Sequence, residues 1–353
     1  MPEPFFSILL PTKNRSIIVG DAIRSVVGQT FSDWELVISD NDDSSTATRE
    51  VVEGFQDARI RYIRTSGRLP MHENWEFAFN QAQGRHVLVL EDKQQLNTNA
   101  LETLHRVLQS DPEAVITYPV ILSPLDQPAP VPASVHPVRM STHELVRRYC
   151  DFDEESWQYL PRGLNSSAPS ALLHQLQKES PTGMLFSHLA PDHSQAYQVL
   201  SKVDGILHLP AEIIFIPTSL KKKGTFSNGL ACIRKDETAQ RWFRELPVPL
   251  EKLTEGVPVK THWMPLNVVL HDFRRFFHRA DCIPKYNWVR YHGLALYMVL
   301  LGRTWGCDMR PEWKAIQESL AQETLMFRLQ VGLDVIRRVV WAVLRKFGGS
   351  RRL

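Results

Sequence analysis

Residues 5–15 read Phe-Phe-Ser-Ile-Leu-Leu-Pro-Thr-Lys-Asn-Arg, and this stretch decides the fold class. Its first six residues form a short, mostly apolar run, and the next five are polar or turn-forming. A run of this length that stops at turn residues is typical of a buried strand. Directly after it, residues 17–29 space their apolar side chains as one face of a helix requires. The stretch therefore predicts a buried strand that ends at Pro11 and passes through a polar turn into a helix.

The same alternation continues through the first third of the chain. Further strands are predicted at 34–39, 59–64, 86–90 and 114–122, and further helices at 44–55, 71–83 and 101–108. Gly84 is expected to end the helix over 71–83, because glycine is the usual residue just past a helix C-terminus. Strands separated by helices at this spacing predict an α/β fold with a mostly parallel sheet. In such sheets ligands bind outside the carboxyl ends of the strands.

The character of the sequence changes after residue 123. Residues 124–137 are rich in proline, which predicts a loop or linker. A helix is predicted at 143–149, and strands at 182–189 and 205–216 flank a helix at 194–202. After residue 230 the sequence becomes helical and aromatic. We therefore expect an α/β domain over residues 1–230 and a mostly helical extension over residues 231–353.

Composition narrows the classes of function. The 353 residues carry a formal net charge of +2, so the chain lacks the broad positive field of a nucleic-acid-binding protein. Its four cysteines, at 150, 232, 282 and 307, have no metal-ligand or redox spacing, which favours free thiols in a reducing compartment. The N-terminus lacks the pattern of a signal peptide, and no apolar run approaches the ~20 residues of a spanning helix. A cytoplasmic location is expected.

Polar side chains gather where the predicted strands end, at 12–15, 40–43, 66–68 and 91–94. The turn over 12–15 begins a helix, whose first backbone N–H groups favour phosphate, and Lys13 and Arg15 add positive charge. A solvated turn is the alternative interpretation of the same residues. These strand ends are where a binding site is expected.

Several short segments, taken in order, resemble a known family. They are residues 11–15, 22–26, 29–31, 39–41, 74–75, 82–84, 90–92 and 100–102, with weaker similarity at 191–193 and 227–229. In this order they resemble the opening of family 2 glycosyltransferases, which have the GT-A fold. The resemblance covers about the first 230 residues and is strongest over the first 110. It implies transfer of a sugar from a nucleoside diphosphate sugar to a hydroxyl of a glycan or a lipid-linked acceptor.

The resemblance also implies roles for residues at the strand ends. Asp40 matches an aspartate that accepts hydrogen bonds from the nucleotide base, and a carboxylate there suits the imide N–H of uracil. Asp40 could instead form a turn or cap a helix. The nucleotide-sugar site is completed by residues of the neighbouring turns, which are Pro11, Thr12, Asn14, Arg15, Arg68, Glu91, Asp92 and Lys93.

The segment Leu90-Glu91-Asp92-Lys93-Gln94 departs from the family pattern. The family usually has two or three aspartates here, in a D-x-D motif that holds Mg²⁺ or Mn²⁺ against the diphosphate. Asp92 takes the first acidic position, whereas Lys93 and Gln94 stand where acids are usual. We expect a weakened metal site at Asp92. Alternatively, Lys93 supplies the positive charge itself.

Asp192 is the candidate catalytic base. It matches an acid that deprotonates the acceptor hydroxyl in inverting members of the family, and a base must reach that hydroxyl directly. Because Asp192 follows Pro191 at a predicted helix start, it could instead cap the helix. His193 is a secondary candidate, although a lone histidine is more often structural.

Two basic segments complete the candidate list. Residues 221–229 could close over the diphosphate as a loop, or form a solvated surface. Residues 331–347 predict a basic amphipathic helix, which lies on an anionic membrane or packs onto the catalytic domain.

The predicted function is therefore sugar transfer from a nucleoside diphosphate sugar, with a UDP-sugar favoured, in glycan or envelope polysaccharide synthesis. The altered acidic motif supports one rival, a nucleotide-sugar-binding protein that has lost turnover. A nucleotidyltransferase is a further alternative, because such enzymes use related α/β sheets.

Overall fold

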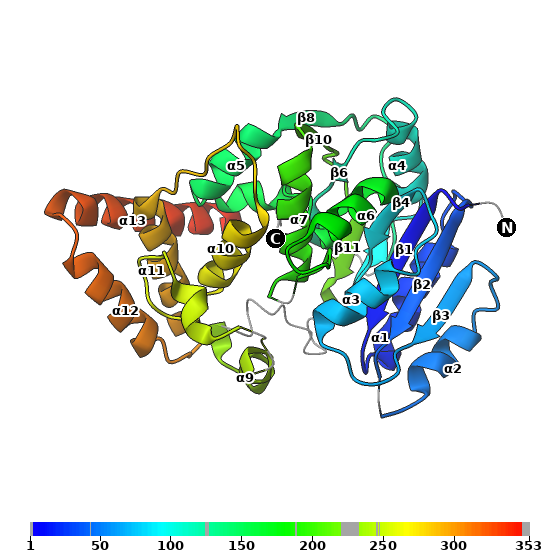
Figure 1. The fold of residues 1–353 in the computed structure, drawn as a ribbon, viewed down its shortest axis with the longest axis horizontal. Helices are drawn as coiled ribbons and strands as arrows, with labels where there is room; N and C mark the ends of the chain where they lie inside the picture. Colours follow the sequence, from blue (N-terminus) through cyan, green and yellow to red (C-terminus); the bar gives the residue numbers. More distant parts are fainter. Residues whose placement is uncertain are drawn as a thin grey trace.

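The computed structural model describes residues 3–42, 44–123, 127–187, 189–219, 233–244, 246 and 248–347 (Figure 1). Eight strands of the described residues form one sheet in the order β3-β2-β1-β4-β9-β6-β10-β8. They are β1 (Phe6–Thr12), β2 (Trp34–Asp40), β3 (Ile60–Arg64), β4 (His86–Val89), β6 (Ile116–Thr117), β8 (Val138–Ser141), β9 (Ser166–Pro169) and β10 (Gly205–His208). The β3-β2-β1-β4 half is parallel throughout, whereas β9 runs antiparallel to both β4 and β6. The predicted α/β fold is confirmed.

A smaller sheet and a set of helices surround this main sheet. The second sheet has the order β5-β11-β7, with β5 (Gln95–Leu96), β7 (Val120–Ser123) and β11 (Ile214–Pro217). The helices of this region are α1 (Ser16–Val27), α2 (Ala47–Glu53), α3 (Met71–Phe79), α4 (Ala100–Leu108), α5 (Thr142–Cys150), α6 (Ser170–Glu179) and α7 (Pro191–Lys202). Two short 3-10 helices, η1 (Glu154–Gln158) and η2 (Gly163–Asn165), precede β9.

The alternation of side chains along β1 builds a core on each face of the sheet. Phe6, Ile8 and Leu10 point into a cluster with residues of α1 and α4. Leu9 points to the opposite face, where it packs in a cluster with Trp75 of α3 and residues of α7. Because successive side chains of a strand face opposite sides, the continuous apolar run in the sequence is what a sheet covered on both faces requires.

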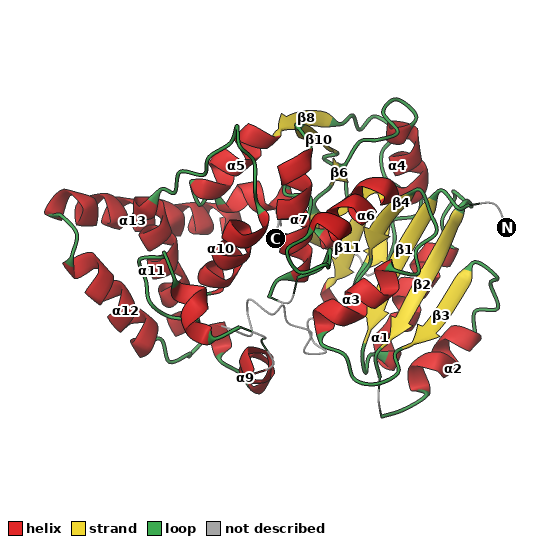
Figure 2. Ribbon diagram, in the orientation of Figure 1, coloured by secondary structure: helices red, strands yellow, loops and turns green. Residues whose placement is uncertain are grey.

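The rest of the described chain is helical, and it lies beside the sheet (Figure 2). It contains α9 (Glu237–Arg244), η4 (Leu250–Thr254), α10 (Pro265–Phe276), α11 (Trp288–Thr304), α12 (Arg310–Ala321) and α13 (Leu325–Phe347). Phe273 of α10 joins the same core cluster as Tyr197 of α7, so the helical region packs directly on the sheet-bearing part. In the described residues, no helix has both the length and the apolar character needed to cross a bilayer.

Several predicted elements differ from the structure. The described residues of 182–189 form no strand, because the amides of Leu185 and Phe186 donate to the Glu76 carboxylate instead of to a neighbouring strand. The runs 114–122 and 205–216 each break into two strands, which belong to different sheets. Elements β8, β9 and α6 were not predicted, since their sequences lack a clear apolar period.

Two single residues were also misread. The strand β1 continues through Pro11, which pairs with Ser39 of β2. The pairing of β1 with β4 has already ended near Leu9, whose carbonyl accepts from Leu90, so the missing N–H of Pro11 breaks no ladder there. Gly84 does not end α3, which stops at Phe79; a Cβ at position 84 would lie 2.6 Å from the backbone nitrogen of Ser7. Glycine is needed there for close approach of the chain to β1.

Candidate functional site

The carboxyl ends of β1 and β4 are joined by a side-chain hydrogen bond. The Thr12 hydroxyl donates to Oδ2 of Asp92 over 3.0 Å. Burial raises the pKa of the Asp92 carboxyl to about 6, although the positive charges of Arg15 and Lys93 and the Thr12 hydrogen bond act in the opposite direction. These two strand ends therefore meet at one point, with an acid and nearby cations.

The turn between β1 and α1 has an unusual backbone. Asn14 takes a positive φ of 55°, a left-handed conformation that asparagine tolerates better than most residues. Arg15 is the N-cap residue of α1, and its carbonyl accepts from the amides of Ile18 and Val19. No side chain caps this helix start. The turn thus brings the open amino end of α1 to the sheet edge, where Arg15 lies close enough to Asp92 to act on its charge.

Asp40 lies next to this turn, because it pairs with Thr12 in the β1–β2 register. Its side chain is fully buried, and Oδ2 accepts from the Tyr62 hydroxyl over 2.6 Å while Oδ1 accepts from the amide of Asp42 over 3.0 Å. Both oxygens are therefore engaged within the protein. A base could use Asp40 only if it shared these oxygens or displaced the Tyr62 hydroxyl.

The neighbouring residues shape the loop that follows β2. The side chain of Asn41 holds both the amide and the carbonyl of Leu69, which ties this loop to the segment containing Arg68. Burial alone would raise the pKa of Asp42, but hydrogen bonds from Ser44 and Ser45 outweigh it and lower that pKa to about 2. The loop is thus held by a set of local hydrogen bonds.

Glu91 and Lys93 pair with each other at the end of β4. The Lys93 Nζ lies 3.1 Å from Oε2 of Glu91, and the backbone amide of Glu91 donates to the Gln94 side chain. Glu91 is thereby neutralised, and Asp92 accepts from Thr12 and lies near two cations. In the described part of the chain, no group of three or more histidine, cysteine, aspartate or glutamate side chains is placed to hold a metal. With Glu91 paired to Lys93, Asp92 is the carboxylate left to share a divalent cation with phosphate oxygens, since Mg²⁺ at phosphate sites is usually held by one or two carboxylates and the phosphates themselves.

Asp192 lies at the start of α7, with Pro191 at the first helical position. Its Oδ2 is 3.7 Å from the Arg162 guanidinium, and 16% of its side chain is exposed. Arg162 directly precedes η2 and β9, and β9 runs antiparallel to β4 with Leu88 opposite Ser167. The segment before β9 therefore lies beyond the carboxyl end of β4. Asp192 consequently belongs to the same end of the sheet as Thr12 and Asp92.

His193 is buried and packs against aromatic side chains. Its Nδ1 lies 3.1 Å from the Tyr197 hydroxyl, and its ring packs edge-to-face on Trp157. Burial lowers the pKa of His193 to about 4, so the imidazole is neutral near pH 7. These contacts favour a packing role over proton transfer.

Two buried acids that position the site were missed from the sequence. The Glu76 carboxylate of α3 accepts from the amides of Leu185 and Phe186 and from Gln177, and so it fixes the segment that leads to α7. The Asp272 carboxylate of α10 accepts from the amide of Ala190, the residue before α7. Both acids lie in amphipathic helical sequence, where a carboxylate is ordinarily expected to face solvent, so no local pattern marked them.

The remaining predicted residues are placed as follows. The basic loop over 221–229 lies outside the described residues. Arg68 lies between β3 and α3, in the segment held by Asn41. The residues 331–347 lie within α13, in the helical region and away from this end of the sheet (Figure 1).

The α/β sheet, with charged groups at the carboxyl ends of β1, β2 and β4, agrees with the GT-A fold. A solved structure of S. aureus TarS, residues 1–349 in complex with UDP-GlcNAc, has a similar fold, with a TM-score of 0.50 and 13% identity. The similarity covers 91% of this chain and 93% of the TarS chain. At this identity, the similarity supports the fold alone.

The family model for glycosyl transferase family 2 matches residues 7–176, a little under half of the chain, so this segment is similar to that family. A Campylobacter jejuni protein named GalNAc(5)-diNAcBac-PP-undecaprenol beta-1,3-glucosyltransferase is 36% identical over 104 residues, which are 29% of this chain and 33% of that protein. An Escherichia coli protein, UDP-Glc:alpha-D-GlcNAc-diphosphoundecaprenol beta-1,3-glucosyltransferase WfgD, is 32% identical over 102 residues, 29% of this chain and 40% of that protein. The chain thus spans a third to two fifths of these relatives. The predicted resemblance to this family is confirmed over residues 7–176, and enzymes of the family commonly use a divalent metal.

Proposed function

We propose that the protein transfers a sugar from a nucleoside diphosphate sugar, with a UDP-sugar favoured, to a hydroxyl of an acceptor glycan. The observation that carries the proposal is the convergence of Thr12, Asp92 and the Asp192–Arg162 pair at one end of the sheet. The similarity to the family supports the same chemistry. Within this site, Asp40 and the turn of Pro11, Thr12, Asn14 and Arg15 face the nucleoside and Arg68 lies nearby, with Asp40 sharing its oxygens between Tyr62 and the base.

The diphosphate is held, in this proposal, by cations of the chain itself. Arg15 and Lys93 flank Asp92, and the amino end of α1 adds N–H groups that favour an anion. When phosphate oxygens approach, Lys93 exchanges its pair with Glu91 for charge-assisted bonds to the diphosphate. The leaving group is then stabilised by fixed positive charge. A metal held by Asp92 is the alternative, and the donor screen below distinguishes the two.

Asp192 is proposed to act as the general base. Its carboxylate is partly exposed at the start of α7, so an acceptor hydroxyl can reach it, and Arg162 holds its orientation. Removal of the hydroxyl proton allows direct attack on the anomeric carbon, with departure of the nucleoside diphosphate. A single displacement of this kind inverts the configuration at that carbon.

We propose that the acceptor is lipid-linked. The names of the Campylobacter jejuni and Escherichia coli relatives each specify an undecaprenol-linked acceptor. The matched segments cover only part of those proteins. An acceptor of this kind lies at a membrane surface. The proposal therefore includes a location at the cytoplasmic face of a membrane, with peripheral contact through residues 331–347.

The test is a donor screen on the purified full chain. Nucleoside diphosphates and their sugars are titrated in EDTA and again in Mg²⁺ or Mn²⁺, and the released nucleotide is identified. We expect a uridine diphosphate sugar to bind in EDTA and a nucleoside diphosphate to be released during turnover. Release of pyrophosphate would indicate a nucleotidyltransferase. Donor binding without sugar transfer or donor hydrolysis would favour the rival hypothesis of a binding protein that has lost turnover. If no nucleoside diphosphate binds, both the transferase and the binding-protein hypotheses are excluded.

A further inference from the structure

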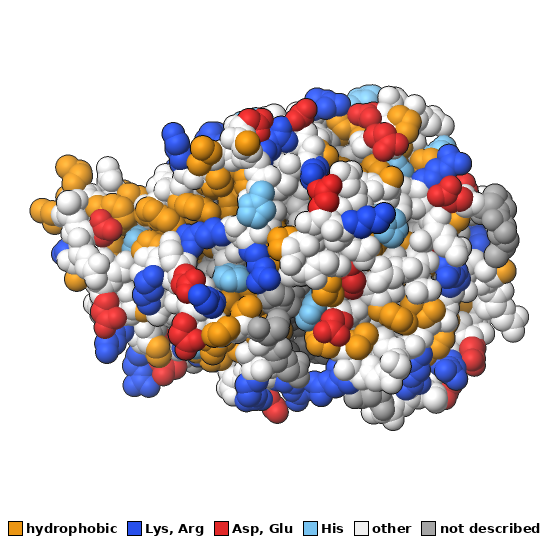
Figure 3. All heavy atoms as spheres, in the orientation of Figure 1, with side chains coloured by type: hydrophobic (Ala, Val, Ile, Leu, Met, Phe, Trp, Pro, Cys, Tyr) orange, Lys and Arg blue, Asp and Glu red, His pale blue; other side chains and the backbone are white. Residues whose placement is uncertain are grey.

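The helix α13 carries a long apolar face that the rest of the described chain leaves uncovered. Eight large apolar side chains recur on it at helical spacing, and each is at least 47% exposed. They are Leu325, Met326, Leu329, Leu333, Ile336, Val340, Val343 and Leu344, and together they are called the α13 outer face. Hydrophobic side chains gather along this helix in Figure 3. A contiguous apolar surface of this size is uncommon on a soluble protein without a partner.

The opposite face of α13 is anchored to the protein by polar contacts. Val331 is buried, and Asp334 forms ion pairs with Arg290 of α11 and with Arg338. The Arg338 guanidinium also lies 3.5 Å from Glu154. Gly293 of α11 lets the two helices approach closely, because a Cβ there would collide with the Asp334 carboxylate. The helix is thus fixed in rotation, with its outer face turned away from the protein.

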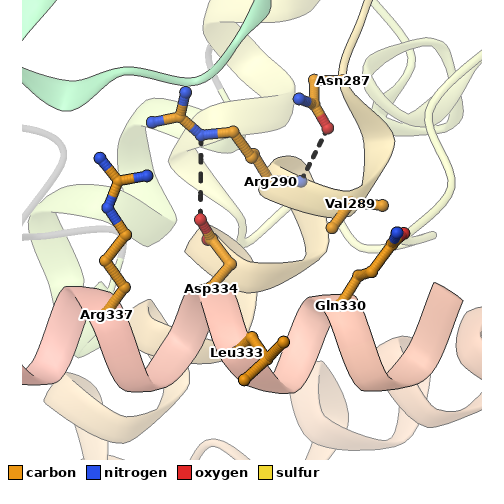
Figure 4. Close-up of a pocket in the computed structure, with 7 residues that line it drawn as sticks. All are labelled: Asn287, Val289, Arg290, Gln330, Leu333, Asp334 and Arg337. Atoms are coloured by element: carbon orange, nitrogen blue, oxygen red, sulfur yellow. Dashed lines mark hydrogen bonds and ion pairs between the residues drawn. The ribbon is translucent and has the colours of Figure 1, made fainter. Parts of the chain in front are cut away.

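The sequence of α13 and of the residues that follow it is rich in basic residues. Asp334 is the only acidic residue in the sequence of α13, and it is turned inward and paired. Arg337 lines a shallow pocket beside Asp334 and Leu333, is exposed, and has no ion pair within the described residues (Figure 4). Residues 325–353 contain seven arginine and lysine residues against this single acid, although the net charge of the whole chain is +2. Positive charge is therefore concentrated at the end of the chain that exposes the apolar face.

We propose that the α13 outer face docks in the plane of an anionic lipid bilayer. An exposed apolar stripe with Arg337 exposed beside it, on a helix whose sequence is rich in basic residues, matches a surface with an acyl interior and negative headgroups. At 1.5 Å per residue, the stripe from Leu325 to Leu344 extends about 28 Å, long enough to lie along the headgroup boundary. A symmetric dimer through the same face is the competing occupant, and the test below distinguishes it from a bilayer. This inference extends the membrane contact of the proposed function, but it rests on α13 and not on sugar transfer.

The test is co-sedimentation of the full chain with vesicles. Pure phosphatidylcholine vesicles are compared with 3:1 phosphatidylcholine and phosphatidylglycerol vesicles, at low and high salt and without donor or acceptor. The wild-type chain is expected to bind the anionic vesicles at least tenfold more than the neutral ones, and to release with salt. The variant Leu329→Gln/Leu333→Gln/Val340→Gln introduces glutamine, a good helix former. It is expected to bind the anionic vesicles at least tenfold less than the wild type.

The matched control changes exposed apolar residues elsewhere, as Val138→Gln/Ile283→Gln, and is expected to bind like the wild type. Circular dichroism and nucleotide binding on the same preparations show whether each variant is folded. Wild-type protein that stays in solution with every vesicle would overturn the inference, as would full binding by the triple variant. If the wild type binds no vesicles but forms a dimer, and the triple variant does not dimerise, the α13 outer face would instead be an interface with a second copy of the chain. Donor binding measured alongside keeps these outcomes separate from a failure of the proposed function.

Discussion

The hydroxyl of Thr12 at the end of β1 donates to the carboxylate of Asp92, just beyond the end of β4, over 3.0 Å. This bond links two strand ends that are 80 residues apart in the sequence. The bond also satisfies the Asp92 carboxylate, so its removal should lower the free energy of unfolding.

Replacing Thr12 with valine keeps the size of the side chain but removes this donor. Because the Asp92 carboxylate would then be desolvated without its bond, we expect the free energy of unfolding to fall by about 1–3 kcal/mol. Urea unfolding at pH 7 measures the change, with Thr12→Ser as the control that retains a hydroxyl. Equal stability of the valine and serine variants would show that the bond contributes little.

Replacing Lys93 with methionine tests whether a side-chain cation holds the diphosphate. The substitution removes one charge-assisted contact, worth about 1.5 kcal/mol, so affinity for a nucleoside diphosphate in EDTA is expected to fall about tenfold. Glu91 would also lose its partner, so Mn²⁺ is expected to restore part of the affinity in this variant. Isothermal titration measures both effects.

The control for this prediction is Lys314→Met, because Lys314 is an exposed lysine of α12. Its affinity is expected to match the wild type with and without Mn²⁺. If Lys93→Met binds the nucleotide as tightly as the wild type in EDTA, the side-chain cation is not what holds the diphosphate.

Glu76→Gln tests the link between α3 and the segment that leads to Asp192. The buried carboxylate accepts from two backbone amides, and an amide side chain cannot replace all of its charge-assisted bonds. We expect a loss of about 1–3 kcal/mol in the free energy of unfolding, together with slower sugar transfer. Glu73→Gln, at a half-exposed position of the same helix, is the control for both measurements. A Glu76 variant as stable as this control would rule out the link.

His193 should make the protein less stable in acid. Its pKa is lowered to about 4 by burial, below the ordinary value of 6.5, so the unfolded chain binds the proton more readily. The contribution of neutral His193 is therefore complete above pH 6.5 and is lost as the pH falls toward 4. At pH 5 the loss amounts to about 2 kcal/mol. His193→Asn should show a smaller drop between pH 7.5 and pH 5 in urea unfolding; an identical drop in both proteins would contradict the assignment.

The sequence was sufficient to predict the buried strands whose side chains pack into a core on each face of the sheet. The apolar run of β1 and its polar continuation predicted both a buried strand and the place of Thr12, since strand ends in a parallel sheet meet at one edge. The bond to Asp92 could not be predicted, because it depends on how far each strand extends. For example, β1 continues past Pro11 to Thr12, whereas the sequence predicted that it ends at Pro11.

The second half of the site was less accessible to sequence reasoning. Asp192 was recognised through a weak similarity, but its partner Arg162 and the supporting acids Glu76 and Asp272 come from distant segments. Their roles depend on tertiary contacts that leave no period in the sequence. Asp40 was placed correctly at the end of β2, yet its burial and its bond with Tyr62 were not foreseen.

The most direct test separates donor binding from turnover in Asp92→Asn and Asp192→Asn, with Asp21→Asn on the surface of α1 as the control. We predict that Asp192→Asn binds the donor like the wild type but transfers sugar 10²–10⁴-fold more slowly, as loss of a general base typically does. Asp92→Asn is predicted to change donor affinity, and Asp21→Asn to change neither quantity. Full transfer activity in Asp192→Asn, measured with an acceptor or as donor hydrolysis, would contradict the proposed site.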